Sequence, residues 1–127
     1  MPSKARPLSP HLGIYRWSMT MALSIVHRMS GGFLGLGAIV MVMVLVSIAS
    51  GPESFSGMQA LLGSFLGQLF LFAWTLALYI HLANGVRHLV WDAGYGFGKE
   101  ESEKTALIAI AAGLALTILT WIVAWVV

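Results

Sequence analysis

Three stretches of this chain carry no Asp, Glu, Lys or Arg over a length that crosses a lipid bilayer. Residues 29–50 form the first, with 22 residues, and residues 105–127 form the second, with 23. At the α-helical rise of about 1.5 Å per residue each is roughly 33 Å long or slightly more, and a bilayer core is about 30 Å thick. A third apolar run lies between them. Because 58% of all residues are hydrophobic and only 9% are charged, the sequence predicts an all-α membrane protein.

The breaks between the apolar runs predict three transmembrane helices, at about residues 21–50, 58–91 and 105–127. A Gly-Pro-Glu-Ser sequence at 51–54 separates the first two, and a loop rich in glycine and charge, 92–104, separates the last two. Residues 1–20 hold three prolines and three basic side chains, and are too polar for a secretory signal. We expect them to form a retained cytoplasmic surface segment ahead of a three-helix transmembrane anchor domain, 21–127.

The basic residues predict the orientation of the chain in the membrane. All seven fall on one side of the predicted spans: Lys4, Arg6, Arg16, Arg28, Arg87, Lys99 and Lys104. The turn predicted at 51–56, on the other side, contains none. The positive-inside rule therefore places the N-terminus in the cytoplasm and the C-terminus outside. We expect the inner membrane of a bacterium, with the mitochondrial inner membrane and its matrix side as the alternative.

Composition also excludes several kinds of site. The chain has no cysteine, so disulfides, thiolate metal sites and iron–sulfur clusters are excluded within it. The basic residues form no stripe of the kind that binds nucleic acid. Two small-residue pairs, Gly31 with Gly35 and Gly63 with Gly67, predict close helix packing. Three spans bury little surface by themselves, so we expect assembly with further transmembrane helices.

The second predicted span ends in a polar cluster. Its members follow helical spacing and predict one continuous helix face: His81, Asn84, Gly85, His88 and Asp92. Ionisable side chains at membrane depth are costly and usually functional. An imidazole that binds iron, a glycine that gives a flat ring room, and polar groups beyond them suit heme. The alternative is that His81 only forms a hydrogen bond with a neighbouring helix.

The first predicted span carries a matching cluster, with Ser24, His27 and Arg28 at positions i, i+3 and i+4. A guanidinium there is able to pair with a heme propionate or another carboxylate through two parallel hydrogen bonds. A hydroxyl and a cation together are also able to hold a quinone carbonyl. Two alternatives stay open: Arg28 reaches out to lipid headgroups, and Ser24 forms a hydrogen bond with a carbonyl of its own helix.

Three sequence blocks resemble a known family. They are Arg-Pro-Leu-Ser-Pro-His-Leu-Gly-Ile-Tyr at 6–15, Ser-Ile-Val-His-Arg-Met-Ser-Gly at 24–31, and His-Leu-Ala-Asn-Gly-Val-Arg-His-Leu-Val-Trp-Asp at 81–92. In this order and spacing they resemble the cytochrome b subunit of succinate dehydrogenase, the larger membrane anchor of respiratory complex II. The blocks and the three spans cover essentially the whole chain. One departure is Thr20, where many relatives have proline before the first helix.

The resemblance implies a complex of a flavoprotein, an iron–sulfur subunit and two three-helix anchors that enclose one heme b. Succinate is oxidised on the flavoprotein, and electrons pass through iron–sulfur clusters to ubiquinone at the membrane surface. By motif position, His81 corresponds to the axial ligand of the heme iron, with the second ligand supplied by the smaller anchor. Ser24 and Arg28 correspond to quinone-site residues, and His27, Arg28 and His88 to residues near the propionates.

Other functions remain open at this stage. The chain is alternatively the anchor of a fumarate reductase or another b-type cytochrome, although two hemes need four axial ligands and it has no convincing second pair inside the membrane. A heme-free transporter or assembly subunit is a further alternative from a different class. An anchor contacts only the quinone pool, so the sequence leaves open the direction of turnover and the choice between ubiquinone and menaquinone.

Overall fold

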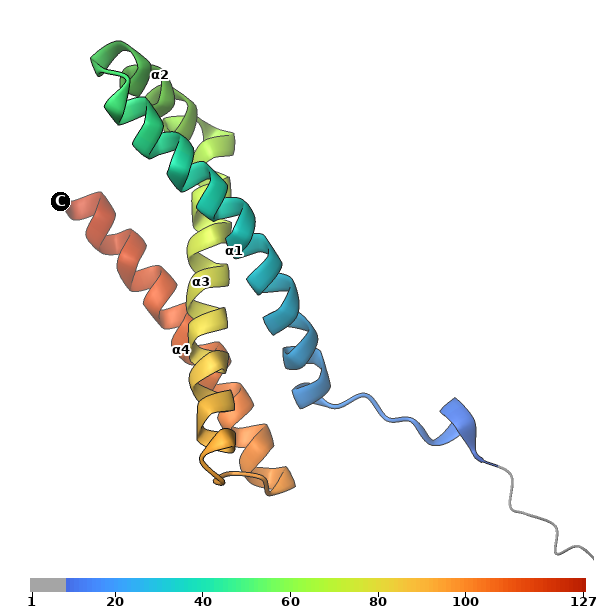
Figure 1. Cartoon of the computed structure of the whole chain (residues 1–127). Coiled ribbons are helices and arrows are strands. Elements are labelled where there is room, and N and C mark those ends of the chain that lie inside the picture. Colours follow the sequence, from blue (N-terminus) through green and yellow to red (C-terminus); the bar gives the residue numbers. More distant parts are fainter. Residues whose placement is uncertain (1–8) are drawn as a thin grey trace, which may run out of the picture.

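The computed structural model describes residues 9–127, and within them it contains helices and no strand. After a short 3-10 turn at His11–Ile14, the chain forms α1 (Met19–Ala49), α2 (Pro52–Gly63), α3 (Phe65–Asp92) and α4 (Lys99–Val126). Helix α3 lies in the middle, with α1 on one side and α4 on the other, and α2 folds back at the far end of α1 (Figure 1). The predicted all-α class is therefore confirmed.

Helices α1, α3 and α4 are each long and apolar enough to cross a membrane, which confirms the three predicted spans. Two of them begin earlier than predicted. The side chain of Ser18 accepts a hydrogen bond from the backbone N–H of Met21 (3.3 Å), so α1 begins at Met19. Helix α4 begins at Lys99, six residues before the apolar run. Glu100 and Glu101 lie in its first turn, where the negative charge of a carboxylate stabilises the helix by interacting with the positive end of its dipole.

The predicted break after the first span is confirmed at Ser50 and Gly51, but the turn is shorter than the predicted 51–56, because Pro52 begins α2 and occupies the helix position that proline favours. The predicted second span at 58–91 consequently consists of two helices that meet at Ser64. This residue has an extended backbone (φ −65°, ψ 161°), ends α2 and caps α3, and its hydroxyl accepts from the Gly67 N–H (3.2 Å). Gly67 lies against the carbonyls of Leu61 and Leu62, so a Cβ there would collide with the backbone.

The three spans approach one another where glycine faces a large side chain. Gly37 of α1 lies directly under the indole of Trp74 on α3, and Gly113 of α4 lies against Ile80 on α3. Gly31 faces the ring of His81, but its predicted partner Gly35 has nothing within 4 Å of an added Cβ. Close helix packing is confirmed, while the residue pairs that mediate it differ from the predicted ones.

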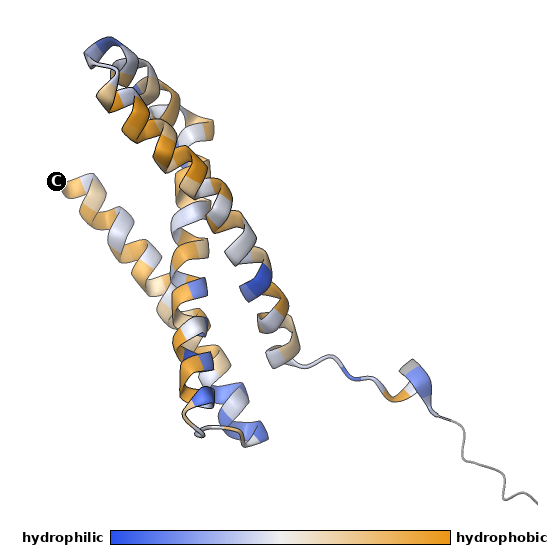
Figure 2. Ribbon diagram, viewed as in Figure 1, coloured by the Kyte–Doolittle hydropathy of each residue, from blue (hydrophilic) through white to orange (hydrophobic). Residues whose placement is uncertain are grey.

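The interior of the bundle is more polar than its surface. The buried apolar residues among 9–127 are Leu23, Ala106 and Ala109, whereas the buried polar ones are Ser30, Ser47, Asn84, Arg87 and Thr117. Large hydrophobic side chains cover the outside along all three spans, and Figure 2 shows hydrophilic residues gathered where α3 ends and α4 begins. This inverted distribution is expected of helices that have lipid or other apolar helices around them.

One end of the bundle carries the polar residues of the predicted site. Helix α1 begins there, α3 ends there and α4 begins there (Figure 1). Five basic residues lie at or near these helix ends: Arg16, Arg28, Arg87, Lys99 and Lys104. Lys4 and Arg6, which also support the predicted orientation, lie outside the described residues. The orientation relative to the two sides of the membrane stays a prediction.

Candidate functional site

His81 is held by the opposite helix through one ring nitrogen only. Its Nδ1 lies 3.0 Å from the backbone carbonyl oxygen of His27 and 3.1 Å from the hydroxyl of Ser30, both on α1. Because a carbonyl oxygen only accepts, Nδ1 carries the proton and donates it. The other nitrogen, Nε2, forms no hydrogen bond with any residue in 9–127 and keeps its lone pair. The alternative of a helix-to-helix hydrogen bond is thus correct for one nitrogen and leaves the other available.

Three imidazoles gather at this point. The rings of His27 and His81 are stacked, with centroids 3.9 Å apart and planes 8° from parallel. The ring of His88 lies 5.2 Å from that of His27, tilted by 45°. His27 Nδ1 is buried and has no hydrogen-bond partner among the described residues. Two helices therefore bring together three of the residues that the sequence assigned to one site.

The predicted polar face of α3 divides in two. His81, Gly85 and His88 face α1, and a Cβ on Gly85 would come within 3.8 Å of His27 Cε1, an ordinary contact. Asn84 instead is fully buried and accepts a hydrogen bond from Arg87, which reaches α4. The prediction of one continuous face was wrong because a helix with a neighbour on each side presents adjacent positions to different partners.

The burial of Arg87 is what sequence reasoning missed, since this residue was recognised in the positive charge and in the third sequence block without a structural role. Its guanidinium donates four hydrogen bonds: to Thr105 Oγ1 (3.0 Å), to Asn84 Oδ1 (3.2 Å), and to the carbonyl and hydroxyl of Ser102 (3.0 Å each). It also lies over the ring of Trp91, 4.0 Å from its centroid. The i, i+3 spacing to Asn84 and the i, i+4 spacing to Trp91 were visible in the sequence, but the partners on α4 were not.

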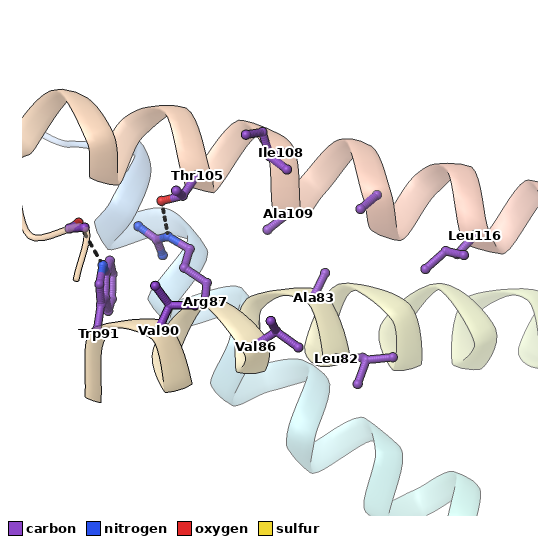
Figure 3. A pocket seen from close by; sticks show the side chains of 12 residues that line it. Leu82, Ala83, Val86, Arg87, Val90, Trp91, Thr105, Ile108, Ala109 and Leu116 are labelled. Carbon is purple, nitrogen blue, oxygen red and sulfur yellow. Dashed lines mark hydrogen bonds between the residues drawn. The ribbon is translucent and has the colours of Figure 1, made fainter. Parts of the chain in front are cut away.

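Figure 3 shows Arg87 reaching from α3 to Thr105 on α4, beside Trp91. Arg87 and Trp91 line one end of an apolar cavity of about 390 Å³ between α3 and α4. Its other walls include Val86, Ile108 and Leu116. The indole N–H of Trp91 donates to the Gly96 carbonyl (3.0 Å) and ties the α3–α4 loop to α3. The Arg87 network is therefore a polar clamp on the start of α4.

Replacing Arg87 with leucine should destabilise the α3–α4 pair. The change leaves the oxygen of the fully buried Asn84 side chain without its donor and removes the hydrogen bonds to Ser102 and Thr105 on α4, at a cost of about 2–4 kcal/mol. We expect a lower midpoint temperature for thermal unfolding of the chain within its complex in detergent. Lys104→Leu is the control, because Lys104 pairs only with exposed Glu100 on its own helix (2.9 Å). Equal midpoints for the two variants would contradict the clamp.

Ser24 and Arg28 line a second, more polar pocket of about 370 Å³ at the start of α1. Arg28 Nη2 donates to Ser24 Oγ (3.1 Å), and the aromatic walls come from Tyr15, Trp17 and Trp91. No hydrogen bond joins the Ser24 hydroxyl to a carbonyl of its own helix within the described residues, so that alternative is not what the structure shows. Arg28 is exposed, whereas His27 beside it turns toward α3.

The site therefore has two parts, a cluster of three imidazoles and a pocket that contains Arg28. The sequence of the chain also matches a known family. The family model for the succinate dehydrogenase/fumarate reductase transmembrane subunit matches residues 2–120. The chain belongs to this family. The predicted resemblance is thereby confirmed. The match also excludes the alternative that this chain belongs to a family of transporters.

Several curated relatives agree along nearly the full length. The succinate dehydrogenase cytochrome b556 subunit of Paracoccus denitrificans is 38% identical over 95% of this chain and 93% of its own length. The cytochrome b560 subunit of Reclinomonas americana is 36% identical over 93% and 85% of the two chains. The mitochondrial cytochrome b560 subunit of Homo sapiens is 36% identical over 91% of this chain and 67% of its own. These three relatives are thus named as cytochrome b subunits of succinate dehydrogenase, an oxidoreductase.

Proposed function

We propose that this chain is the heme b-binding membrane anchor of a succinate:quinone oxidoreductase and helps to form its quinone-reduction site. The observation that carries the proposal is the orientation of His81, whose Nδ1 donates to a carbonyl while Nε2 keeps its lone pair. Histidines that bind metals almost always have their other nitrogen tied in this way. The names of the relatives, cytochromes b556 and b560, support the choice of a heme.

The residues around His81 fit such a group. Among the described residues, no group of three or more ligating side chains is arranged to hold one metal ion, and the three clustered imidazoles are no exception. His81 would hold the iron from one side, and the second anchor subunit would supply the other axial ligand. His27, His88 and Arg28 would serve the propionates, with Gly85 beside the ring. When bound, the heme supplies a one-electron redox centre inside the membrane.

The pocket of Ser24 and Arg28 supports a role in binding quinone. Because the Ser24 oxygen accepts from Arg28, its own hydroxyl proton is free to be donated to a carbonyl oxygen. Arg28 keeps a fixed positive charge beside that oxygen, which gains negative charge as the quinone is reduced. The aromatic walls suit a flat ring, and the pocket lies at the polar end of the bundle, where an electron donor outside the lipid would approach.

The proposed partners follow from what the chain lacks and from its family. It contains no cysteine, so the iron–sulfur clusters belong to another subunit, and succinate is oxidised on a flavoprotein. A second, smaller anchor would cover the imidazole cluster. The positive charge distribution favours the inner membrane of a bacterium, with the catalytic head on the cytoplasmic side. The family includes fumarate reductase anchors, but the curated relatives named above are succinate dehydrogenase subunits, which favours succinate oxidation.

Purification from the native membrane through an affinity tag on this chain should yield a four-subunit complex with a b-type heme spectrum. A flavoprotein, a cysteine-rich subunit and a second anchor should be identified by mass spectrometry. The same chain expressed alone should aggregate or be degraded, because the polar groups of the imidazole cluster, including the His27 Nδ1 that no described residue pairs, cannot face lipid without a partner. A monodisperse, protease-resistant subunit that neither binds heme nor recruits partners would contradict the proposed function.

A further inference from the structure

Ser30 completes a compact hydrogen-bonded unit with His81. Its hydroxyl lies 2.9 Å from the His27 carbonyl oxygen and 3.1 Å from His81 Nδ1, and Nδ1 itself lies 3.0 Å from the same carbonyl. Ser30 is buried, with only 7% of its surface exposed. Two oxygen atoms from one turn of α1 therefore converge on Nδ1 of the imidazole.

The donors and acceptors of this unit have one consistent assignment. The carbonyl accepts from both neighbours, so Ser30 gives its proton to the carbonyl and His81 gives the proton of Nδ1. The lone pairs of Ser30 Oγ then face the same N–H, which is shared between two acceptors. In the Nε2–H tautomer, Nδ1 would turn a lone pair toward the acceptor-only carbonyl and lose that hydrogen bond, and Ser30 would have to move its proton from the carbonyl to Nδ1. The carbonyl and Ser30 together therefore favour the tautomer with a free lone pair on Nε2.

Steric contacts restrict how the ring turns about that hydrogen bond. One face is covered by the ring of His27, 3.9 Å away. Near its Cε1 lies Gly31, where an added Cβ would come to 3.0 Å. Glycine is required here for the close approach rather than for backbone conformation. The imidazole plane is thus defined by contacts with His27, Ser30 and Gly31, which lie within about one turn of α1.

We propose that Ser30 is a positioning residue that sets the tautomer, the plane and the electron-donating strength of the His81 imidazole. This inference rests on the proposed role of His81 as a heme ligand. An N–H shared between two acceptors makes the imidazole a stronger donor to a metal, and outer partners of this kind affect both affinity and redox potential. Loss of Ser30 Oγ leaves one acceptor, so the ligand becomes weaker and the oxidised iron is stabilised less.

The test compares three variants in the assembled complex. Ser30→Ala should raise the heme midpoint potential, change the low-spin g values in electron paramagnetic resonance, and speed heme loss in detergent roughly tenfold. Ser30→Thr keeps a hydroxyl able to bond the i−3 carbonyl and should restore all three quantities. Ser47→Ala is the matched control, because Ser47 is equally buried on α1 and also donates to an i−3 carbonyl (Val44, 2.7 Å), far from the histidines.

An unchanged potential and unchanged g values in Ser30→Ala would overturn the proposal, as would equal shifts in Ser47→Ala. If Ser30→Ala fails to assemble, Gly31→Ala tests the same positioning of His81, since the added Cβ must displace the His81 ring. Gly35→Ala is its control, because a Cβ at Gly35 meets nothing within 4 Å. Unaltered g values in Gly31→Ala would then reject the positioning unit. Failure of the proposed function is distinguished separately, because His81→Ala would in that case leave the heme spectrum intact.

Discussion

His81→Ala should abolish the b-type heme spectrum of the assembled complex, or leave a heme with displaced absorption bands and a changed redox potential. The alanine removes the only imidazole of the cluster whose Nδ1 donates to a carbonyl while Nε2 stays free among the described residues. His81 would be one of the groups that hold the heme iron, so its loss would weaken heme binding and alter the redox centre. Reduced-minus-oxidised difference spectra and a potentiometric titration measure both effects.

His88→Ala is the matched control for this experiment. His88 belongs to the same cluster, 5.2 Å from His27 between ring centroids, but no hydrogen bond ties its ring to a carbonyl of residues 9–127. We expect this variant to retain the heme with at most a modest shift in potential. An unchanged spectrum and midpoint in His81→Ala, with all subunits assembled, would reject the ligand assignment. His88 would then become the next candidate.

Arg28→Leu should lower succinate–quinone activity strongly, on the order of a hundredfold, a magnitude typical of losing one preorganised donor to a developing oxyanion. The leucine removes both the fixed charge and the hydrogen bond that orients Ser24 (3.1 Å). Ser24→Ala should have a milder effect and mainly raise the KM for quinone. Steady-state assays with a soluble quinone analogue measure these constants.

Two comparisons make the interpretation specific. Succinate oxidation by an artificial dye that accepts electrons at the catalytic head should be largely retained in Arg28→Leu, which shows that the head is intact. Arg16→Leu removes an exposed positive charge nearby in the chain that does not line the pocket, and it should leave quinone activity near normal. If Arg28→Leu instead shifts the heme potential while quinone reduction and inhibitor binding stay normal, Arg28 serves only the propionates and the quinone assignment must be dropped.

The elements that the sequence predicted well are those set by local composition. Charge-free runs of bilayer length identified three spans, and all three are present as α1, α3 and α4. The error lay at the connection between the first two. Pro52 was interpreted as a helix breaker, and the chain does break beside it at Gly51. Proline also favours the first turn of a helix, however, so Pro52 begins α2, and Ser64 provides a second break twelve residues later. Which of the two roles proline takes depends on where the chain reverses, which is a tertiary property.

The candidate site shows the same division. Helical spacing placed Ser24 next to Arg28, and their hydrogen bond is present. Spacing also put Asn84 on the face of His81, whereas the structure turns Asn84 toward Arg87 and α4. Arg87 was recognised in the positive charge and in the third sequence block, but its partners Ser102 and Thr105 lie on another helix and were not predictable from spacing.

The sequence by itself determined that this chain crosses a membrane three times and belongs to a family of respiratory anchors, because hydropathy, helix length and motif order are properties of neighbouring residues. Only the tertiary structure decided which nitrogen of His81 is tied, since its partners lie 51 and 54 residues away on another helix. The tertiary structure also decided that Arg87 is buried against α4, and which glycines allow the helices to approach one another closely. The rotation of each helix about its axis depends on which small residue lies opposite which large one, and that pairing exists only once the helices have packed.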